Sequence, residues 1–212
     1  MPAMERSAGE RSLREAIVRA GERLGRRGLI VAGEGNISVR VSRDRLLITP
    51  SGLRKDELEP GDLIVVDVHG GAAHASTDGR RPSSDVAIHR AIYAARADIA
   101  AVVHAHVPAA MALTLEGEIP DPGALPETAL LLPRLPFVPF GAPGSDELAT
   151  RIAAALGEPP VPLPGAALLE RHGAVAVGVT VDEAVDRMEL VDVLCRIWRD
   201  ALLIRAARGT MS

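Results

Sequence analysis

Short β-rich runs alternate with helical segments along the whole chain, and this alternation restricts the fold more than any other feature. Apolar and polar residues alternate with period two over residues 37–41. The run 46–48 follows after a polar turn, which predicts a hairpin. Capping-box spacings, Ser12 with Glu15 and Thr180 with Glu183, precede segments with helical periodicity. No repeat or low-complexity tract interrupts the pattern, so we predict a single α/β domain over residues 1–212.

The elements can be placed from these patterns. The predicted strands cover residues 37–41, 46–48, 64–68, 101–106, 137–140, 168–170 and 175–177, and the predicted helices cover residues 12–27, 84–96, 108–115, 145–156 and 180–207. A loop is expected over residues 69–80. The proline-punctuated stretch 120–143 gives no clear pattern apart from its one strand.

Composition narrows the class of protein. Hydrophobic residues make up 47% of the chain, enough to form a core, but aromatic residues only 2%, so the core must be mainly aliphatic. The formal net charge of −4 gives no case for a nucleic-acid partner or an anionic membrane. Cys195 is the only cysteine, which excludes an intramolecular disulfide and fits a reducing compartment. We see no secretory signal and no apolar run of membrane-spanning length, so we expect a cytoplasmic protein.

Two histidines, His104 and His106, give the strongest local signal for chemistry. Residues two apart on a strand point to the same face, so the two imidazoles should project together. Paired neutral imidazoles can hold a metal, although a catalytic site needs a third protein ligand. His172 is the best candidate, because Gly173 after it would allow close approach of backbone and ligand. The alternative is that all three are ordinary polar or core histidines.

Three short turns carry small polar residues that suit an anion. Their hydroxyl, amide and backbone N–H groups can hold a phosphate without a lysine, and a helix opening at Ser84 would add a positive dipole end. Taken singly, each segment is also an ordinary turn or helix cap. The candidate phosphate-binding residues are Asn36, Ser51, Gly52, Ser83 and Ser84.

Two acidic residues are candidates for proton transfer. Asp85 follows the paired serines, where it either complements the helix dipole or serves a metal as ligand or a substrate as base. Glu127 lies among prolines and aliphatic residues, and the sequence leaves it open between a solvated charge and a deliberately placed acid.

The ordered set of these motifs resembles the class II aldolase/adducin family. The motifs are Gly35-Asn-Ile-Ser, Thr49-Pro-Ser-Gly, Ser83-Ser-Asp, Val103-His-Ala-His and His172-Gly, and the resemblance covers roughly residues 13–199. That family includes fuculose- and rhamnulose-phosphate aldolases and ribulose-phosphate 4-epimerase. The resemblance implies a three-layer α/β/α domain around a mainly antiparallel sheet, and a homotetramer with active sites between subunits.

The resemblance also implies roles for individual residues. The family's zinc ligands fall on His104, His106 and His172, and its phosphate-binding positions fall on Asn36, Ser51, Gly52, Ser83 and Ser84. Asp85 stands where fuculose-phosphate aldolase has a catalytic Glu, and matches the epimerase, in which this Asp contacts the metal. Glu127 matches an acid that rhamnulose-phosphate aldolase supplies from a neighbouring subunit. The tyrosines that several members use as acids have no counterpart here.

These residues lead to a functional hypothesis. We expect a metal-dependent aldolase that cleaves a small phosphorylated ketose through a metal-stabilised enediolate, with Zn²⁺ as the metal or Mn²⁺, Co²⁺ or Fe²⁺ in its place. Asp85 is expected to be ionised beside the cation as a weak base or fourth ligand, and Glu127 to be desolvated, with a raised pKa. A sugar-phosphate 4-epimerase, dehydratase or decarboxylase would use the same site. A non-catalytic, adducin-like domain would have no need of the three histidines.

Overall fold

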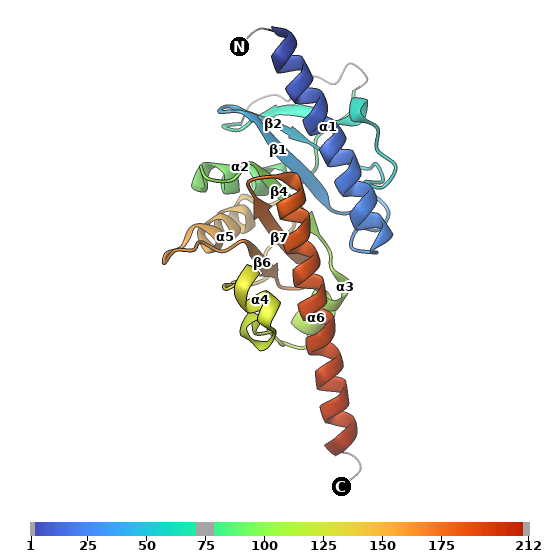
Figure 1. The fold of residues 1–212 in the computed structure, drawn as a ribbon, viewed down its shortest axis with the longest axis vertical. Helices are drawn as coiled ribbons and strands as arrows, with labels where there is room; N and C mark the ends of the chain where they lie inside the picture. The colour runs from blue at the N-terminus through green and yellow to red at the C-terminus, as the bar shows by residue number, and fades with distance from the viewer. Residues whose placement is uncertain (1–2, 71–78, 210–212) are drawn as a thin grey trace.

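The computed structural model describes residues 3–70 and 79–209, and within them one mixed sheet has helices on both faces (Figure 1). The strands run in the order β3-β2-β1-β4-β7-β6-β5, and neighbours pair antiparallel except β5 and β6, which are parallel. The strands are β1 (Asn36–Ser42), β2 (Arg45–Ile48), β3 (Ile64–Asp67), β4 (Ala101–Ala105), β5 (Phe137–Val138), β6 (Ala166–Leu169) and β7 (Gly173–Gly178). The predicted α/β fold around a mainly antiparallel sheet is confirmed.

The helices form the two outer layers of the domain. They are α1 (Ala3–Arg26), α2 (Val86–Ala95), α3 (Pro108–Leu115), α4 (Pro126–Leu131), α5 (Asp146–Gly157) and α6 (Val181–Gly209), with short 3₁₀ turns at Pro60–Asp62 and Pro122–Ala124. Helices α1, α3 and α6 cover one face of the sheet, and α2 and α5 cover the other. Consecutive residues of β4 contribute to the hydrophobic cores on opposite faces of the sheet: Val103 packs toward α1 and α6, and Val102 packs toward α2 and α5.

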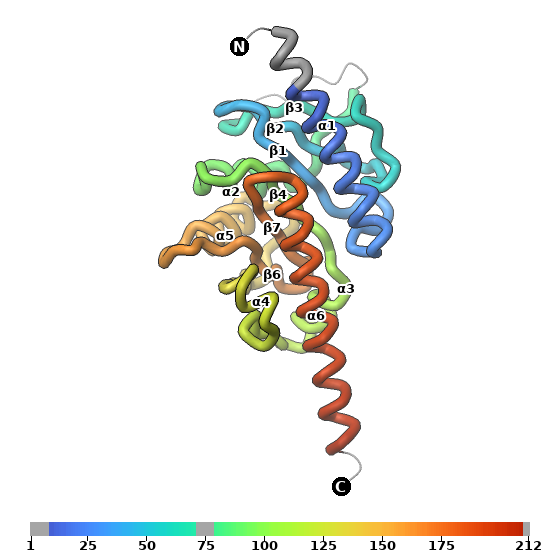
Figure 2. The backbone as a smooth tube through the Cα atoms, viewed as in Figure 1, coloured from blue at the N-terminus to red at the C-terminus, as the bar shows by residue number. Residues whose placement is uncertain are grey.

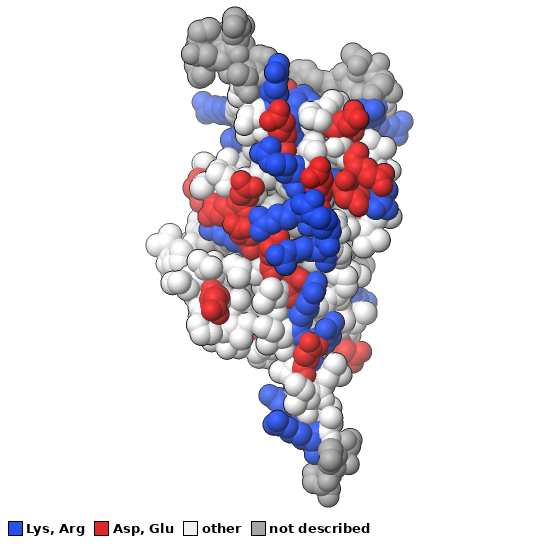
Figure 3. Space-filling view, turned by 45° about the vertical axis from the view of Figure 1, so that its right-hand side comes forward, with Lys and Arg blue, Asp and Glu red and all other residues white. Residues whose placement is uncertain are grey.

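Charged side chains join α1 to α6. Arg23 pairs with Asp186 at 2.7 Å and with Glu189 at 2.6 Å, and Arg27 pairs with Glu189 at 2.9 Å. Basic and acidic side chains gather across the middle of this face (Figure 3). The far half of α6 extends beyond the sheet (Figure 2), where Leu203 and Ile204 are 63% and 55% exposed. No helix in the described ranges is long and apolar enough to cross a membrane.

Several predicted helix ends are confirmed and two are wrong. The side chain of Thr180 accepts from the N–H of Glu183 at the start of α6, as its spacing predicts. Helix α1 begins at Ala3 rather than at Ser12, because the residues before Ser12 are mostly good helix formers. Helix α2 begins at Val86 rather than at Ser84, because Ser83 to Val86 forms a turn closed by Val86 N and Ser83 O at 3.1 Å.

Prolines account for the departures in the segment that the sequence leaves unassigned. The predicted strand 137–140 shortens to Phe137–Val138, since Pro139 has no N–H to donate to a ladder. Helix α4 (Pro126–Leu131) lies in this stretch and was not predicted; Pro126 occupies its first position, which suits proline. Of the expected loop 69–80, residues 71–78 lie outside the described part of the chain.

Gly173 lies where β7 comes close to the backbone at the end of β4. Its φ is +99°, and a Cβ at this position would overlap the backbone of Ala105 and His106. A side chain here is therefore excluded both by the backbone conformation and by space.

We predict that Gly173→Ala lowers the free energy of unfolding by about 2 kcal/mol or more, because it adds left-handed strain and a steric overlap. Chemical denaturation of the purified protein measures the change. Gly61→Ala is the matched control, since a Cβ there meets no atom within 4 Å. Equal stability losses in the two variants would contradict this reading of Gly173.

Candidate active site

Three imidazoles meet at the end of β4. His104 is on β4, His106 follows it directly, and His172 lies in the turn before β7, which pairs with β4 through Ala105 and Ala174. Ring centroids lie 5.4 Å apart for His104 and His106, 4.7 Å for His104 and His172, and 5.5 Å for His106 and His172. One nitrogen from each ring lies within 4.8 Å of the others. The strand spacing therefore aligns the first two histidines as predicted, and the turn supplies the third.

The hydrogen bonds of these rings suit a metal site. His104 Nδ1 lies 3.0 Å from the carbonyl oxygen of Ala174, and His106 Nδ1 lies 3.0 Å from a carboxylate oxygen of Glu34. His104 Nε2 is buried and has no hydrogen-bond partner among the described residues. A buried polar atom without a partner is costly, and a divalent cation would satisfy it. The three histidines therefore fit a metal ion.

Burial sets the charge state of two of these rings. Burial lowers the pKa of His104 below its ordinary value, and the neighbouring His172 adds to that effect. Burial also lowers the pKa of His172. Both rings are therefore held neutral, which is the form that binds metals.

Asp85 lies beside the histidines. It is the N-cap residue of α2, and its Oδ2 is 4.0 Å from His104 Nε2. The side-chain amide of Asn36 donates to the same oxygen at 2.8 Å. Asn36 stands directly opposite His104 in the β1–β4 pair, so the two strands and the helix bring the carboxylate to the imidazoles.

The segments predicted to hold a phosphate lie together. Pro50 and Pro82 form a β-bridge, Ser51 N donates to Arg81 O at 2.9 Å, and Ser83 N donates to Thr49 O at 3.2 Å. Ser51, Gly52 and Ser84 are exposed there, whereas Ser83 is buried. The side chain of Ser83 accepts from the N–H of Asp85 at 3.3 Å. Asn36 differs from the others, because both polar atoms of its amide bond to protein groups, Asp85 and His89.

Known proteins of one family resemble this chain over most of its length. The family model of the class II aldolase and adducin N-terminal domain matches residues 15–199. The chain belongs to this family. It is 33% identical to the 3-oxo-tetronate 4-phosphate decarboxylase of Cupriavidus necator, over 89% of this chain and 84% of that protein. It is 34% identical to the methylthioribulose-1-phosphate dehydratase of Acidiphilium cryptum, over 84% of this chain and 85% of that protein.

A solved member of the class II aldolase family has the same fold. The crystal structure of L-fuculose-1-phosphate aldolase from Thermus thermophilus aligns with a TM-score of 0.79 and 31% identity, over 92% of this chain and 96% of that one. The protein is therefore an enzyme of the class II aldolase superfamily. Its similar relatives carry out different reactions on phosphorylated compounds, so membership alone leaves the individual activity open.

Two residues near the candidate site were not singled out from the sequence. Lys55, the only lysine in the chain, is buried, and its Nζ donates to Gly33 O at 2.7 Å and Leu53 O at 2.6 Å. It thereby ties the loop before Asn36 to the loop after Gly52, and burial lowers its pKa. Glu34, beside His106, is the other. Lys55 could have been singled out from the sequence because it is the only lysine in the chain. Nothing comparable marks Glu34, which is an acidic residue in a glycine-rich loop.

Glu127 is not brought to the histidines within one chain. It lies exposed in the first turn of α4, which packs on α6, and it forms no hydrogen bond or ion pair with the described residues. The expected desolvation of its carboxylate does not occur inside a single chain, because α4 presents this side chain to solvent.

We predict that His104→Ala removes most of the bound divalent metal, since it deletes a ligand whose Nε2 has no hydrogen-bond partner in the described part of the chain. Metal content after dialysis, measured by mass spectrometry, tests this, with circular dichroism to confirm the fold. His69→Ala is the control, because the His69 side chain is 70% exposed and lies outside the cluster. Stoichiometric metal in His104→Ala would overturn the assignment.

Proposed function

We propose that this enzyme is a metal-dependent aldolase that cleaves a carbon–carbon bond of a small phosphorylated ketose. The observation that carries the proposal is the meeting of His104, His106 and His172 with the Asp85 carboxylate. Exposed neutral donors on the neighbouring turns add a site for a phosphate. A divalent ion held by the histidines, Zn²⁺ above all, would act as a Lewis acid that stabilises the negative charge of an enediolate.

The residues of the chain take distinct roles in this proposal. Ser51, Ser83 and Ser84 bind the phosphate through their hydroxyl groups, and Gly52 and Ser84 add backbone N–H groups. A carboxylate accepts the proton of the ketose hydroxyl, the adjacent carbon–carbon bond breaks, and the aldehyde leaves. The remaining fragment takes up a proton at carbon. Asp85 is placed to act either as this base or as a fourth metal ligand.

Decarboxylation of a phosphorylated 3-oxo acid is the second candidate. It is favoured by the relative from Cupriavidus necator, which is 33% identical. Loss of carbon dioxide leaves the same kind of carbanion beside a carbonyl but requires no base to remove a hydroxyl proton. An Asp85 held as a metal ligand would suit that reaction as well as it suits aldol cleavage.

We propose that Glu127 acts in the active site of a neighbouring chain, in a homotetramer. It is exposed on α4 next to Leu130 and Leu131, whose side chains are 77% and 52% exposed. Adjacent exposed apolar side chains are a feature of surfaces that bind other proteins. Burial at such an interface would raise the pKa of Glu127 and suit it to proton transfer.

A substrate screen tests the proposed reaction. Metal-loaded protein is incubated with ketose 1-phosphates, the corresponding free ketoses and phosphorylated 3-oxo acids, and dihydroxyacetone phosphate, aldehyde and carbon dioxide are measured. We expect dihydroxyacetone phosphate and an aldehyde from a ketose 1-phosphate. Carbon dioxide from an oxo acid alone would favour the second candidate, and no turnover of any phosphorylated compound would contradict both.

We predict that Ser84→Ala raises KM for the phosphorylated substrate by about tenfold, because a charge-assisted hydrogen bond is lost. Turnover of the unphosphorylated analogue should change little. Ser12→Ala, which removes an exposed hydroxyl within α1, is the matched control. Equal effects of Ser84→Ala on both substrates would count against a phosphate at this turn.

Glu127→Gln should lower kcat by about 100-fold while the protein retains its metal, since general acid–base catalysis contributes that order of rate. Mixing it with His104→Ala chains should restore part of the activity, because some sites then receive both intact halves. Glu116→Gln, another exposed acid, controls for the loss of charge. Wild-type turnover in Glu127→Gln would exclude its role.

A further inference from the structure

Five polar side chains interleave between α2 and β1 behind the active site. Asp85, His89 and Tyr93 are spaced by four residues on the helical segment, and Asn36 and Ser38 are spaced by two on the strand. Four helical residues rise about 6 Å and two strand residues about 6.8 Å, so the two rows advance almost in step. The strand side chains therefore fit between successive helix side chains.

The contacts follow this interleaved order without a gap. Asn36 Nδ2 is 2.8 Å from Asp85 Oδ2, and Asn36 Oδ1 is 2.5 Å from His89 Nε2. The other nitrogen of that ring, His89 Nδ1, is 2.6 Å from Ser38 Oγ. Ser38 Oγ is 3.1 Å from the hydroxyl of Tyr93. All five side chains are buried, so water does not compete for these bonds.

The chemistry of the groups fixes the direction of the bonds that run from Asp85 through Asn36 and His89 to Ser38. An ionised carboxylate only accepts, so the amide nitrogen of Asn36 must face Asp85 and its oxygen must face His89. His89 Nε2 must therefore carry a proton and donate. Burial lowers the pKa of His89 to about 4, so the ring is neutral and Nδ1 accepts from the Ser38 hydroxyl. A side-chain amide held in this way cannot rotate to present its oxygen to the carboxylate.

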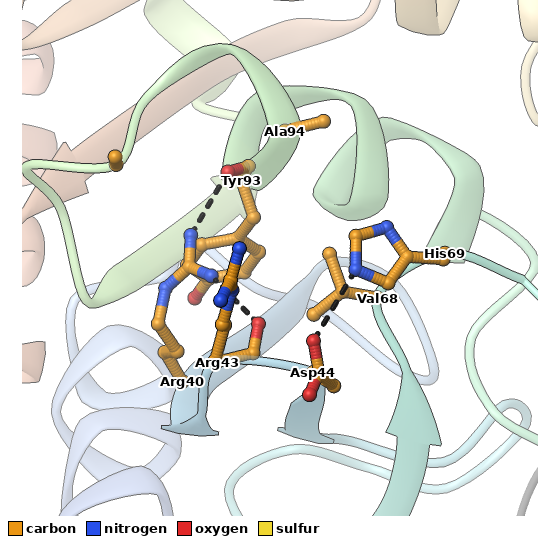
Figure 4. Close-up of a pocket in the computed structure, with 8 residues that line it drawn as sticks. Arg40, Arg43, Asp44, Val68, His69, Tyr93 and Ala94 are labelled. Carbon is orange, nitrogen blue, oxygen red and sulfur yellow. Dashed lines mark hydrogen bonds and ion pairs between the residues drawn. The ribbon is translucent and has the colours of Figure 1, made fainter.

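The far end of the chain of bonds is anchored as well. The guanidinium of Arg40 lies 4.7 Å from the centre of the Tyr93 ring, and its Nη2 donates to Tyr93 O at 2.9 Å (Figure 4). The Tyr93 hydroxyl has one proton to donate, and three acceptors lie within its reach: Ser38 Oγ and Ser38 O, both at 3.1 Å, and Ala100 O at 3.2 Å. Arg40 and Tyr93 line a separate pocket of about 580 Å³ near the opposite end of β1. The network thus runs from that pocket to the histidine cluster.

We propose that His89 is a positioning residue, which fixes the Asn36 amide and through it holds the Asp85 carboxylate toward the three histidines. The proposal rests on the proposed function of Asp85 and deepens it, since His89 itself touches neither metal nor substrate. The alternative is that His89 is only structural: a buried polar residue with all its hydrogen bonds made, whose removal lowers the stability of the protein and nothing else. If His89 is a positioning residue, its effect on metal binding depends on the Asp85 carboxylate. If its role is only structural, its effect does not depend on Asp85.

A double-mutant cycle separates the two roles, with the Co²⁺ dissociation constant of metal-free protein as its readout. His89→Leu should raise this constant about tenfold, the order expected for loss of an outer-shell partner. The same change on an Asp85→Asn background should raise it less than about twofold further, because the carboxylate to be positioned is gone. Equal, additive effects on both backgrounds would overturn the proposal.

Rescue and a matched control sharpen the test. His89→Gln places an amide N–H near the position of Nε2, so its metal affinity should stay within about threefold of wild type. Arg96→Gln removes buried bonds to Leu156 O and Pro164 O at the other end of α2, and should lower the melting temperature without changing metal affinity. Loss of affinity in Arg96→Gln equal to that in His89→Leu would show that general destabilisation causes both.

The unsubstituted protein gives a second measurement in case His89→Leu does not fold. Side-chain ¹⁵N NMR at pH 7 should show His89 as the neutral tautomer protonated at Nε2. A ring protonated at Nδ1 alone, or at both nitrogens, would overturn the proposal. Neither measurement uses a substrate, so a wrong assignment of the reaction leaves them unaffected and is detected separately by the substrate screen.

Discussion

The antiparallel pairing of β4 on both of its sides is the constraint on which the rest of the site depends. On one side Asn36 stands opposite His104, and on the other Ala105 stands opposite Ala174. The first register brings an amide, and behind it a carboxylate, to the imidazole. The second brings the turn with His172 to within reach of the other rings. A shift of one residue in either pair would turn the side chains to the wrong face.

The polar row of the site lies on the face of the sheet that α2 and α5 cover. The face covered by α1, α3 and α6 packs aliphatic side chains against the strands, and aliphatic contacts also dominate under α5. Polar groups concentrate where α2 crosses β1, and Asn36, Ser38, Asp85, His89 and Tyr93 form a row of contacts there. A fully bonded polar row is rigid in a way that an aliphatic one is not. This rigidity is what a carboxylate beside a metal site needs, because small displacements of a catalytic group lower the rate strongly.

Much of this arrangement could be predicted from the sequence, because strand periodicity acts locally. The two-residue spacing of His104 and His106 was enough to place both rings on one face, and the ordered motifs identified the family and pointed to His172. The amide of Asn36 could not be assigned in the same way. The sequence shows its spacing to Ser38 and that of Asp85 to His89, but not that the two rows face each other. Glu34 and Lys55 act through loop contacts that no periodic pattern encodes. The role proposed for Glu127 requires a neighbouring chain, whose placement no local pattern encodes either.

The central claim is that three imidazoles hold one catalytic divalent ion, and X-ray absorption spectroscopy of the Zn²⁺-loaded protein tests it most directly. The geometry of the cluster predicts three imidazole nitrogens around the ion at about 2.0–2.1 Å, with remaining coordination by oxygen. The outer-shell features of imidazole rings should be present in the spectrum. A sulfur ligand, fewer than two imidazoles, or failure to take up stoichiometric Zn²⁺ would contradict the account.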